Sequence, residues 1–599
     1  MSILTFKFQE ILSVKPSSYL SFVFLCISTS AMLGCGDISL SSNNEKTRDI
    51  LPIVTPKAET KAIAIDPTAN NIDGNEMLEH IKKLSSDEFE GRAPNSKGEE
   101  LTIKYLQDNF QKLGLKPGNP DGTFVQKVPL VSYKIDDKVE MKFSAGDKNL
   151  SLKFRDDFVG WTRQLTNTVN MDAELVFVGY GAQAPEFGWD DFKGEDLKGK
   201  VLVMLINDPP LPDDKMFGGK AMTYYGRWTY KFEMAMQKGA AGCIIIHEDG
   251  PAGYPWEVVR NSWGSGGFTI SDKNNNMGLC PVESWVTFPK AKEIFQMGGK
   301  DLEALKKEAL KKEFKPIPLG IKASVNFKNE FKKVESNNFI AKLEGSDPTL
   351  KDEYVIFTAH WDHFGVGEPA TDKDGKPINN DKIYNGAKDN ATGTAALLEL
   401  AKTYTKLSTA PKRSLLFLAV TAEERGLLGS AYYGQNPLYP NSKAVAVINM
   451  DSMNVTGKTK DIIVVGLGNS TLDDYVKGVA ATQNREVKPD QEPEKGYFYR
   501  SDHFSFAKQG VPALDAGAGK ELVGKTAEES KKIFEAYTTT DYHKPSDEVK
   551  PDWDLSGAVE DLKLLFQVGL EVANAKEIPT WRDGTEFKAK REESLKAGK

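Results

Sequence analysis

Apolar residues recur along the 599-residue chain at two spacings, one typical of helices and one of strands. Spacings of three and four predict helices at 77–84, 98–113, 230–238 and 392–407, and Gly114 is a typical stop for the second. Alternating or nearly continuous apolar runs predict strands at 173–180, 200–206, 242–247, 353–357, 414–420 and 444–448.

The order of these elements indicates the fold class. From residue 334 to 573 strands and helices alternate, which predicts an α/β fold with a mixed, largely parallel sheet flanked by helices on both faces. The segment 167–318 is different, because its strands carry no acids and histidines at metal-ligand spacing. A chain of 599 residues is also too long for one core, so we expect at least two domains.

The net charge changes the set of functions that we consider. The formal charge is −8, and no large stripe of Lys and Arg is visible along the chain. Nucleic-acid binding depends on neutralising phosphates with clustered cations. We therefore expect no nucleic-acid partner.

The N-terminus reads as a targeting segment. Basic residues precede an apolar run at 19–33, which ends in Gly34-Cys35. This resembles a bacterial lipoprotein signal, which implies a lipidated Cys35, membrane attachment, and a place in the cell envelope, either periplasmic or at the cell surface. An ordinary cleaved signal and an uncleaved anchor are the alternatives. Cleavage before Cys35 leaves Cys243 and Cys280 to form a disulfide or to stay free.

Five short motifs carry the chemistry, and three of them follow the predicted strands at 353–357, 414–420 and 444–448. Only six histidines occur in the chain, and two of them fall in these motifs where metal ligands are needed. The motifs are His360-Trp-Asp362-His363, Asp389-Asn, Glu423-Glu424, Asp451-Ser and His543. In α/β sheets, functional residues gather at the carboxyl ends of strands, so we expect these side chains to meet.

A hydrolytic centre with two metal ions explains these residue types. It needs a carboxylate that bridges the ions and a bridging water whose pKa they lower. His360 is a candidate ligand with Asp362 orienting its imidazole, and Asp389 at a helix start is placed to bridge. Of Glu423 and Glu424, one can bind metal while the other acts as general base, because adjacent side chains at a strand end point in different directions. Imidazole and carboxylate suit Zn²⁺, with Mn or Co as substitutes.

The order of these motifs resembles metallopeptidase family twenty-eight, the co-catalytic dizinc aminopeptidases. The resemblance covers most of the chain after the N-terminal segment and implies a zinc aminopeptidase fold of the phosphorylase/hydrolase-like type with two Zn²⁺ per chain. It implies His360 and Asp451 on one zinc and Glu424 and His543 on the other. It also implies that Asp389 bridges both ions, that Glu423 is the general base and that Asp362 supports His360.

The segment 167–318 resembles a protease-associated (PA) domain. The match rests on Lys231-Phe-Glu-Met-Ala235-Met-Gln-Lys-Gly239-Ala-Ala-Gly242. Such a domain is a β-rich insertion that covers or frames an active site, and it is also a place for a protein partner. Within this domain we expect His247 to be structural, as we do for the lone His80 nearer the N-terminus.

Together these observations predict six segments along the chain. They are a lipoprotein signal peptide (1–34), a flexible tether (35–71), the N-terminal part of the peptidase domain (72–166), the PA insertion (167–318), the dizinc catalytic domain (319–580) and a charged C-terminal tail (581–599).

The predicted function is a zinc-dependent exopeptidase, an aminopeptidase that removes N-terminal residues from peptides through a metal-bridging water and Glu423. One alternative on the same scaffold is a carboxypeptidase or dipeptidase, for which Arg500 and Lys544 offer positive charge. The others are a glutaminyl cyclase-like acyltransferase and a non-catalytic relative, which the full ligand set disfavours.

Four further residues keep open roles. His363 is either a support for the ligands, a wall of the pocket or a structural residue, and His503 contacts substrate or holds a loop. Tyr497 and Tyr499 are candidate donors to the oxyanion.

Overall fold

The computed structural model describes residues 62–598, apart from 137, 213–215, 265 and 371–375. The predicted signal segment, Cys35 and most of the predicted tether lie outside the described residues. Residues 62–71, which the sequence places in the tether, pack on the fold, where the Asp66 N–H donates to Gln567 Oε1 over 2.7 Å. Among the helices of the described ranges, none combines the length and the apolar character needed to cross a membrane.

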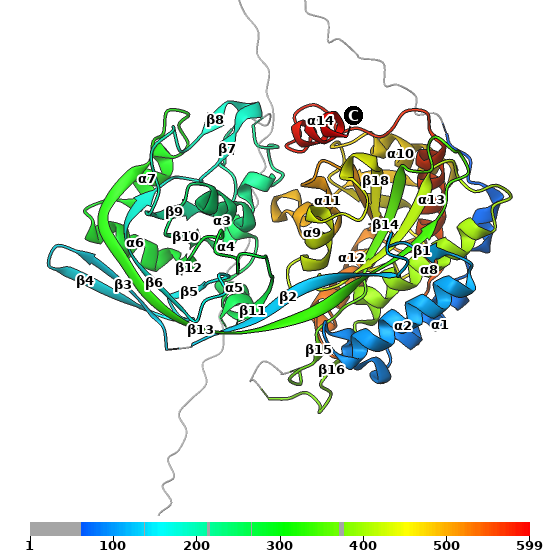
Figure 1. The fold of residues 1–599 in the computed structure, drawn as a ribbon, viewed down its shortest axis with the longest axis horizontal. Coiled ribbons are helices and arrows are strands. Elements are labelled where there is room, and N and C mark those ends of the chain that lie inside the picture. Colours follow the sequence, from blue (N-terminus) through cyan, green and yellow to red (C-terminus); the bar gives the residue numbers. More distant parts are fainter. Residues whose placement is uncertain (1–61, 137, 213–215, 265, 371–375, 599) are drawn as a thin grey trace, which may run out of the picture. The chain divides into compact units, whose positions relative to one another are not determined.

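The larger strands form two sheets that share one long strand, β13 (Ile317–Leu343) (Figure 1). In spatial order, the first sheet contains β11 (Gly267–Ile270), β2 (Val125–Ile135), β13, β17 (Ser414–Val420), β14 (Tyr354–His360), β18 (Ala444–Asn449), β21 (Ala513–Ala518), β19 (Asp461–Val465) and β20 (Glu486–Pro489). The central strands β17, β14, β18 and β21 are parallel, and antiparallel partners on either side make the sheet mixed. This confirms the predicted fold class.

The central strands of the first sheet are buried on both sides because helices cover both faces of the sheet. Val355, Phe357 and Ala359 of β14 join a core with α1 (Gly74–Leu84), α2 (Lys97–Lys112), α8 (Thr392–Thr405) and α13 (Ser556–Asn574). The alternate residues Tyr354 and Ile356 join a core that includes α9 (Leu428–Gln435) and α11 (His503–Ala507). The remaining helices of this unit are α10 (Leu472–Thr482), α12 (Ala527–Thr540) and α14 (Lys588–Ala597).

We call residues 138–328 without β11 the second-sheet unit and the other described residues, β11 included, the first-sheet unit. The second sheet contains, in order, β4 (Lys148–Lys153), β3 (Glu140–Ala145), β13, β6 (Thr168–Phe177), β9 (Val201–Leu205), β10 (Gly242–His247), β12 (Glu283–Thr287) and β5 (Phe158–Trp161). Its helices are α3 (Trp228–Gln237), α4 (Asp249–Ala252), α5 (Trp256–Trp263), α6 (Phe288–Met297) and α7 (Leu302–Glu308). The sheet takes strands from both sides of the predicted boundary at residue 167, and the PA assignment stays a prediction.

The short strands add local pairs. β1 (Lys116–Pro117) pairs with β13, β7 (Gln183–Ala184) pairs with β8 (Trp189–Asp190), and β15 (Gly365–Val366) pairs with β16 (Ile383–Tyr384). Cys243 and Cys280 are buried free thiols.

The two histidines outside the motifs that were expected to be structural contact aromatic side chains. His80 Nδ1 lies 2.6 Å from the Tyr105 hydroxyl. The His247 ring contacts the rings of Tyr254, Trp256 and Trp285.

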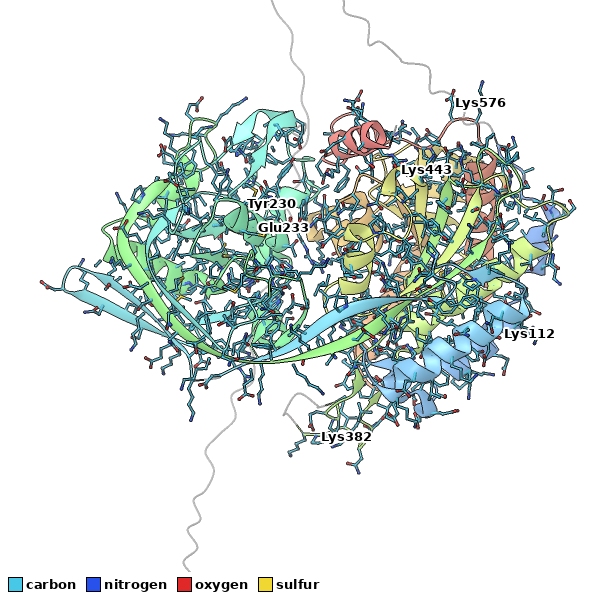
Figure 2. The ribbon with its side chains drawn as sticks, in the orientation of Figure 1. Lys112, Tyr230, Glu233, Lys382, Lys443 and Lys576 are labelled. Carbon is cyan, nitrogen blue, oxygen red and sulfur yellow. The ribbon has the colours of Figure 1, made fainter. Side chains whose placement is uncertain are left out.

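The second-sheet unit contacts the first-sheet unit along a seam beside α3 and α11. Lys508 Nζ lies 2.5 Å from Glu233 Oε1, and Figure 2 labels Glu233 on α3. The Met222 N–H donates to the Pro493 carbonyl over 3.0 Å. The loop at 493–502 is therefore held from both units.

Candidate metal centre

Three parallel strands bring His360, Glu423 and Asp451 to one edge of the first sheet. β14 ends at His360, Glu423 follows β17 by three residues, and Asp451 follows β18 by two. Because these strands are parallel neighbours, their carboxyl ends meet at the same edge. His360 Nε2 lies 3.4 Å from Asp451 Oδ1 and 3.9 Å from Glu423 Oε2.

Asp389 lies between two histidines. Its Oδ1 is 3.2 Å from His360 Nε2, and its Oδ2 is 3.4 Å from His543 Nε2. His543 Nε2 is also 3.2 Å from Glu424 Oε2. The cluster thus divides into two adjacent sets, each with one histidine and one carboxylate of its own, and the two sets share Asp389.

The charge of this cluster fits a divalent cation. Burial raises the pKa of Glu424 to about 8, with the neighbouring Asp389 adding to the shift. Burial also raises the pKa of Glu423 well above its ordinary value; His360 opposes this shift, and Glu424 adds to it. Two imidazoles carry at most two positive charges against four crowded carboxylates, whereas Zn²⁺ ligated by imidazole and carboxylate suits this donor set.

Hydrogen bonds hold the carboxylates that would bind metal. Asp547 accepts the N–H groups of Lys388 and Asp389, each over 3.0 Å. The Ser501 hydroxyl donates to Asp451 Oδ2 over 2.7 Å. Such contacts fix ligand orientation.

Asp362 has a different geometry from the one expected of a direct imidazole partner. His360 Nδ1 lies 3.1 Å from the main-chain oxygen of Asp362 and 4.0 Å from its carboxylate. The carboxylate instead accepts the Glu423 N–H over 3.0 Å. Asp362 therefore connects the strand ends that carry His360 and Glu423.

His363 also belongs to the cluster, which the sequence left open. Its Nδ1 lies 2.6 Å from Glu424 Oε1, and its side chain is fully buried. Burial lowers the pKa of His363 to about 3, so the ring is neutral beside the Glu424 carboxyl group. Its position three residues after His360 was the only feature of the sequence that could have placed it in the cluster.

Tyr542 is a site residue that sequence reasoning missed. Its ring stacks on the His543 ring with centroids 3.7 Å apart. Desolvation and then the carboxylates of Asp389 and Glu424 hold the pKa of Tyr542 above its ordinary range, so its hydroxyl remains a proton donor. Its place next to His543 in the sequence was the feature that could have identified it as a site residue.

The tyrosines and histidine named earlier as open candidates contact residues outside the proposed ligand set. The Tyr499 hydroxyl donates to Glu586 over 2.8 Å, and the Tyr497 ring lies against the Arg500 guanidinium. His503 is buried, with Nδ1 3.7 Å from Asp515 Oδ2.

A histidine and carboxylate cluster at the carboxyl edge of an α/β sheet is typical of metal-dependent hydrolases. Residues 338–567 match the sequence model of Peptidase family M28. This range contains all the cluster residues described above.

Curated relatives match over part of their length. The aminopeptidase NAALADL1 of Mus musculus is 28% identical over 196 residues, which are 30% of this chain and 24% of that protein. A probable glutamate carboxypeptidase of Arthroderma benhamiae is 29% identical over 195 residues, 30% of this chain and 26% of that protein. The chain thus spans about a quarter of the length of these relatives.

Two solved structures are similar in outline. An aminopeptidase from Aneurinibacillus sp. strain AM-1 aligns with a TM-score of 0.46 and 18% identity, covering 85% of this chain and 96% of that one. BSAP, a zinc aminopeptidase from Bacillus subtilis, aligns with a TM-score of 0.38 and 17% identity, covering 84% and 96%.

Proposed function

We propose that this protein is a zinc metallopeptidase of family M28 that acts on peptides as an aminopeptidase. The observation that carries the proposal is the shared position of Asp389 between His360 and His543, with Glu423 beside the cluster. The match of residues 338–567 to the M28 model supports the family assignment.

The residues have distinct roles in this proposal. Two zinc ions would be held by His360, Asp389, Asp451, Glu424 and His543. When bound, zinc polarises a carbonyl oxygen and lowers the pKa of water.

Glu423 takes a proton from the attacking water and delivers it to the leaving amine. Its carboxylate suits both steps because it lies beside His360, at 3.9 Å, without being one of the proposed ligands. Tyr542 donates a hydrogen bond to the oxygen of the scissile carbonyl as negative charge develops there.

The proposed assignment of the N-terminus is separate from the chemistry. We propose that Cys35 anchors the protein as a lipoprotein of the bacterial cell envelope, periplasmic or at the cell surface. The Gly34-Cys35 pair after the apolar run at 19–33 supports this proposal.

The function is tested by incubating purified, zinc-loaded protein with one peptide in free and N-acetylated forms and following products by mass spectrometry. Stepwise loss of residues from the free amino end alone is the expected result. Cleavage of both forms from the carboxyl end would assign a carboxypeptidase, the activity in the name of the Arthroderma relative. Absence of cleavage of either form would overturn the peptidase assignment.

A further inference from the structure

Tyr537, near the C-terminal end of α12, is linked to the metal centre through both its side chain and its main chain. Its hydroxyl donates to Asp547 Oδ2 over 3.2 Å, and the same oxygen accepts the Asp389 N–H over 3.0 Å. The Tyr537 carbonyl accepts the Tyr542 N–H over 3.0 Å. Tyr537 is therefore connected to Asp389 on one side and to the segment that carries His543 on the other.

The Lys388 side chain reaches the same tyrosine. Its ammonium lies over the Tyr537 ring, with Nζ 3.9 Å from the ring centroid, a distance at which the aromatic face attracts a cation. The Lys388 N–H donates to Asp547 Oδ1 over 3.0 Å. Lys388, Tyr537 and Asp547 thus form a closed loop of contacts beside Asp389. Among the described residues the ammonium makes no ion pair, so the ring is its principal partner.

The segment that follows Tyr537 depends on such contacts. Of the 14 residues of α12 only Ser530, near the start of the helix, is buried. The chain then reaches His543 with φ +58°, a left-handed conformation that persists only where neighbouring contacts hold it. The Tyr537 ring lies 6.0 Å from the Tyr542 ring, edge to face, and Tyr542 stacks on His543. The position of Tyr537 therefore affects the geometry of His543.

We propose that Lys388 is a positioning residue that fixes Tyr537 beside the metal centre. Through Tyr537 it orients two of the proposed zinc ligands, Asp389 and His543. This inference rests on the proposed function and adds to it a residue that acts behind the ligands.

The sign of the effect on zinc affinity separates positioning from simple charge. A positive charge near the metal centre repels Zn²⁺, so if only its charge mattered, removing the ammonium would tighten zinc binding. Positioning predicts the opposite, because ligands that lose their support bind metal less tightly.

The test begins with Lys388→Met, which keeps most of the length of the side chain and removes its charge. Zinc affinity, measured by titration with a competing chelator, should fall by about 3- to 30-fold, the effect of losing a cation–π contact. Lys388→Arg, which keeps a cation for the ring, should bind zinc nearly as tightly as the wild type. Equal or tighter zinc binding by Lys388→Met would overturn the inference.

A double-mutant cycle with Tyr537→Leu identifies the partner of the ammonium. In the Tyr537→Leu background, Lys388→Met should change zinc affinity by less than about twofold, because the contact is already lost. In the Tyr537→Phe background the full effect should remain, since the ring remains. An effect of full size with leucine would overturn the inference. The matched control is Lys292→Met, which removes an ammonium 4.8 Å from the Phe288 ring and should leave zinc affinity unchanged.

Hydrogen exchange of the full-length protein without metal distinguishes failure of this inference from failure of the proposed function, because it needs neither zinc nor peptide. The amides of residues 541–547 should exchange faster in Lys388→Met than in the wild type, since the contact that holds their segment is lost. Equal exchange in the two proteins would overturn the inference and leave the peptidase assignment intact. Should Lys388→Met fail to fold, Lys388→Gln takes its place in each measurement.

Discussion

At the scale of single residues, the adjacent acids Glu423 and Glu424 have different surroundings. Glu424 lies 3.2 Å from His543 and 2.6 Å from His363. Glu423 lies 3.9 Å from His360, and its N–H is fixed by Asp362. The family resemblance implies that Glu424 is a ligand and Glu423 the base, and the packing adds that Glu424 has two histidine neighbours where Glu423 has one.

Glu423→Gln should keep bound zinc and lose about 10²- to 10⁴-fold in kcat, because general acid–base transfer contributes an effect of this size. Metal analysis together with peptide kinetics measures both quantities. Activity near that of the wild type would remove Glu423 as the general base.

A buried carboxyl group in the second-sheet unit gives stability a pH dependence. Asp191 accepts the Ala182 N–H over 2.9 Å and the Trp189 indole N–H over 2.8 Å. Burial raises the pKa of Asp191 from its ordinary 3.8 to about 6. The folded state therefore binds the proton more tightly than the unfolded state, and the stability from this group, present below pH 3.8, is lost as pH rises through about 6.

In Asp191→Asn this loss should be absent. The difference in free energy of unfolding between wild type and variant should fall by about 3 kcal/mol from pH 3.5 to pH 7, at about 1.4 kcal/mol per pKa unit. Urea unfolding at several pH values measures it, with the exposed Asp147→Asn as matched control. A difference that is constant with pH would contradict the assignment.

At the scale of elements, Arg92 connects segments that carry the metal centre. Its buried guanidinium donates to the carbonyls of Leu84, Trp361, Asn385 and Gly386 over 2.6 to 2.8 Å. The preceding Gly91 has φ +66°, and a Cβ there would come within 2.4 Å of the Tyr384 carbonyl. The turn at 91–92 thus needs glycine so that the arginine can reach both metal-bearing segments.

Arg92→Lys should lower zinc affinity by about 10- to 100-fold, the usual effect of losing support behind ligands. A lysine ammonium has three donors on one atom and cannot replace the spread of the guanidinium. Zinc titration with a competing chelator measures the effect, and Arg582→Lys, at a partly exposed arginine paired with Asp474, is the control. Unchanged zinc affinity would show that the carbonyls hold their positions without Arg92.

The apolar pattern predicted the central elements closely. The predicted strand at 414–420 is β17, and the predicted helices at 98–113 and 392–407 are α2 and α8. Long apolar patterns of this kind specify an element because only one backbone conformation, helix or strand, buries all their apolar residues on the core side. The sequence did not predict the length of β13, which continues from one sheet into the other. Its pairing with different partners in the two sheets is a tertiary property.

At the scale of the whole molecule, crowded carboxylates make stability depend on metal. Glu424 belongs to one group of possible metal ligands with Asp389 and to another with Glu423. A ligand that binds only the folded state stabilises it, by about 4 kcal/mol when its concentration is 1,000 times its Kd.

Removing metal with a chelator should therefore lower the thermal midpoint, and zinc should restore it. Calorimetry with metal analysis measures this shift, and Asp389→Ala should show little response to either treatment. Complete removal of metal with an unchanged midpoint would contradict a metal centre built into the fold.

The C-terminal segment also shows what the whole molecule adds. The sequence predicts a charged tail at 581–599, yet Trp581 is buried and its indole N–H donates to the Gly510 carbonyl over 2.8 Å. Arg591 of α14 donates to the carbonyls of Asn441 and Ala444. The segment is mostly charged, so its sequence does not indicate the few buried contacts that fix it to the fold.

The sequence by itself determined the fold class and the acids and histidines of the cluster, because periodicity and strand-end motifs are local properties of the chain. The family resemblance already implied a bridging Asp389, whereas only the tertiary structure gave its distances of 3.2 and 3.4 Å from His360 and His543 and brought Tyr542 and His363 to the site. These relations join residues far apart along the chain, and packing rather than local pattern sets their distances.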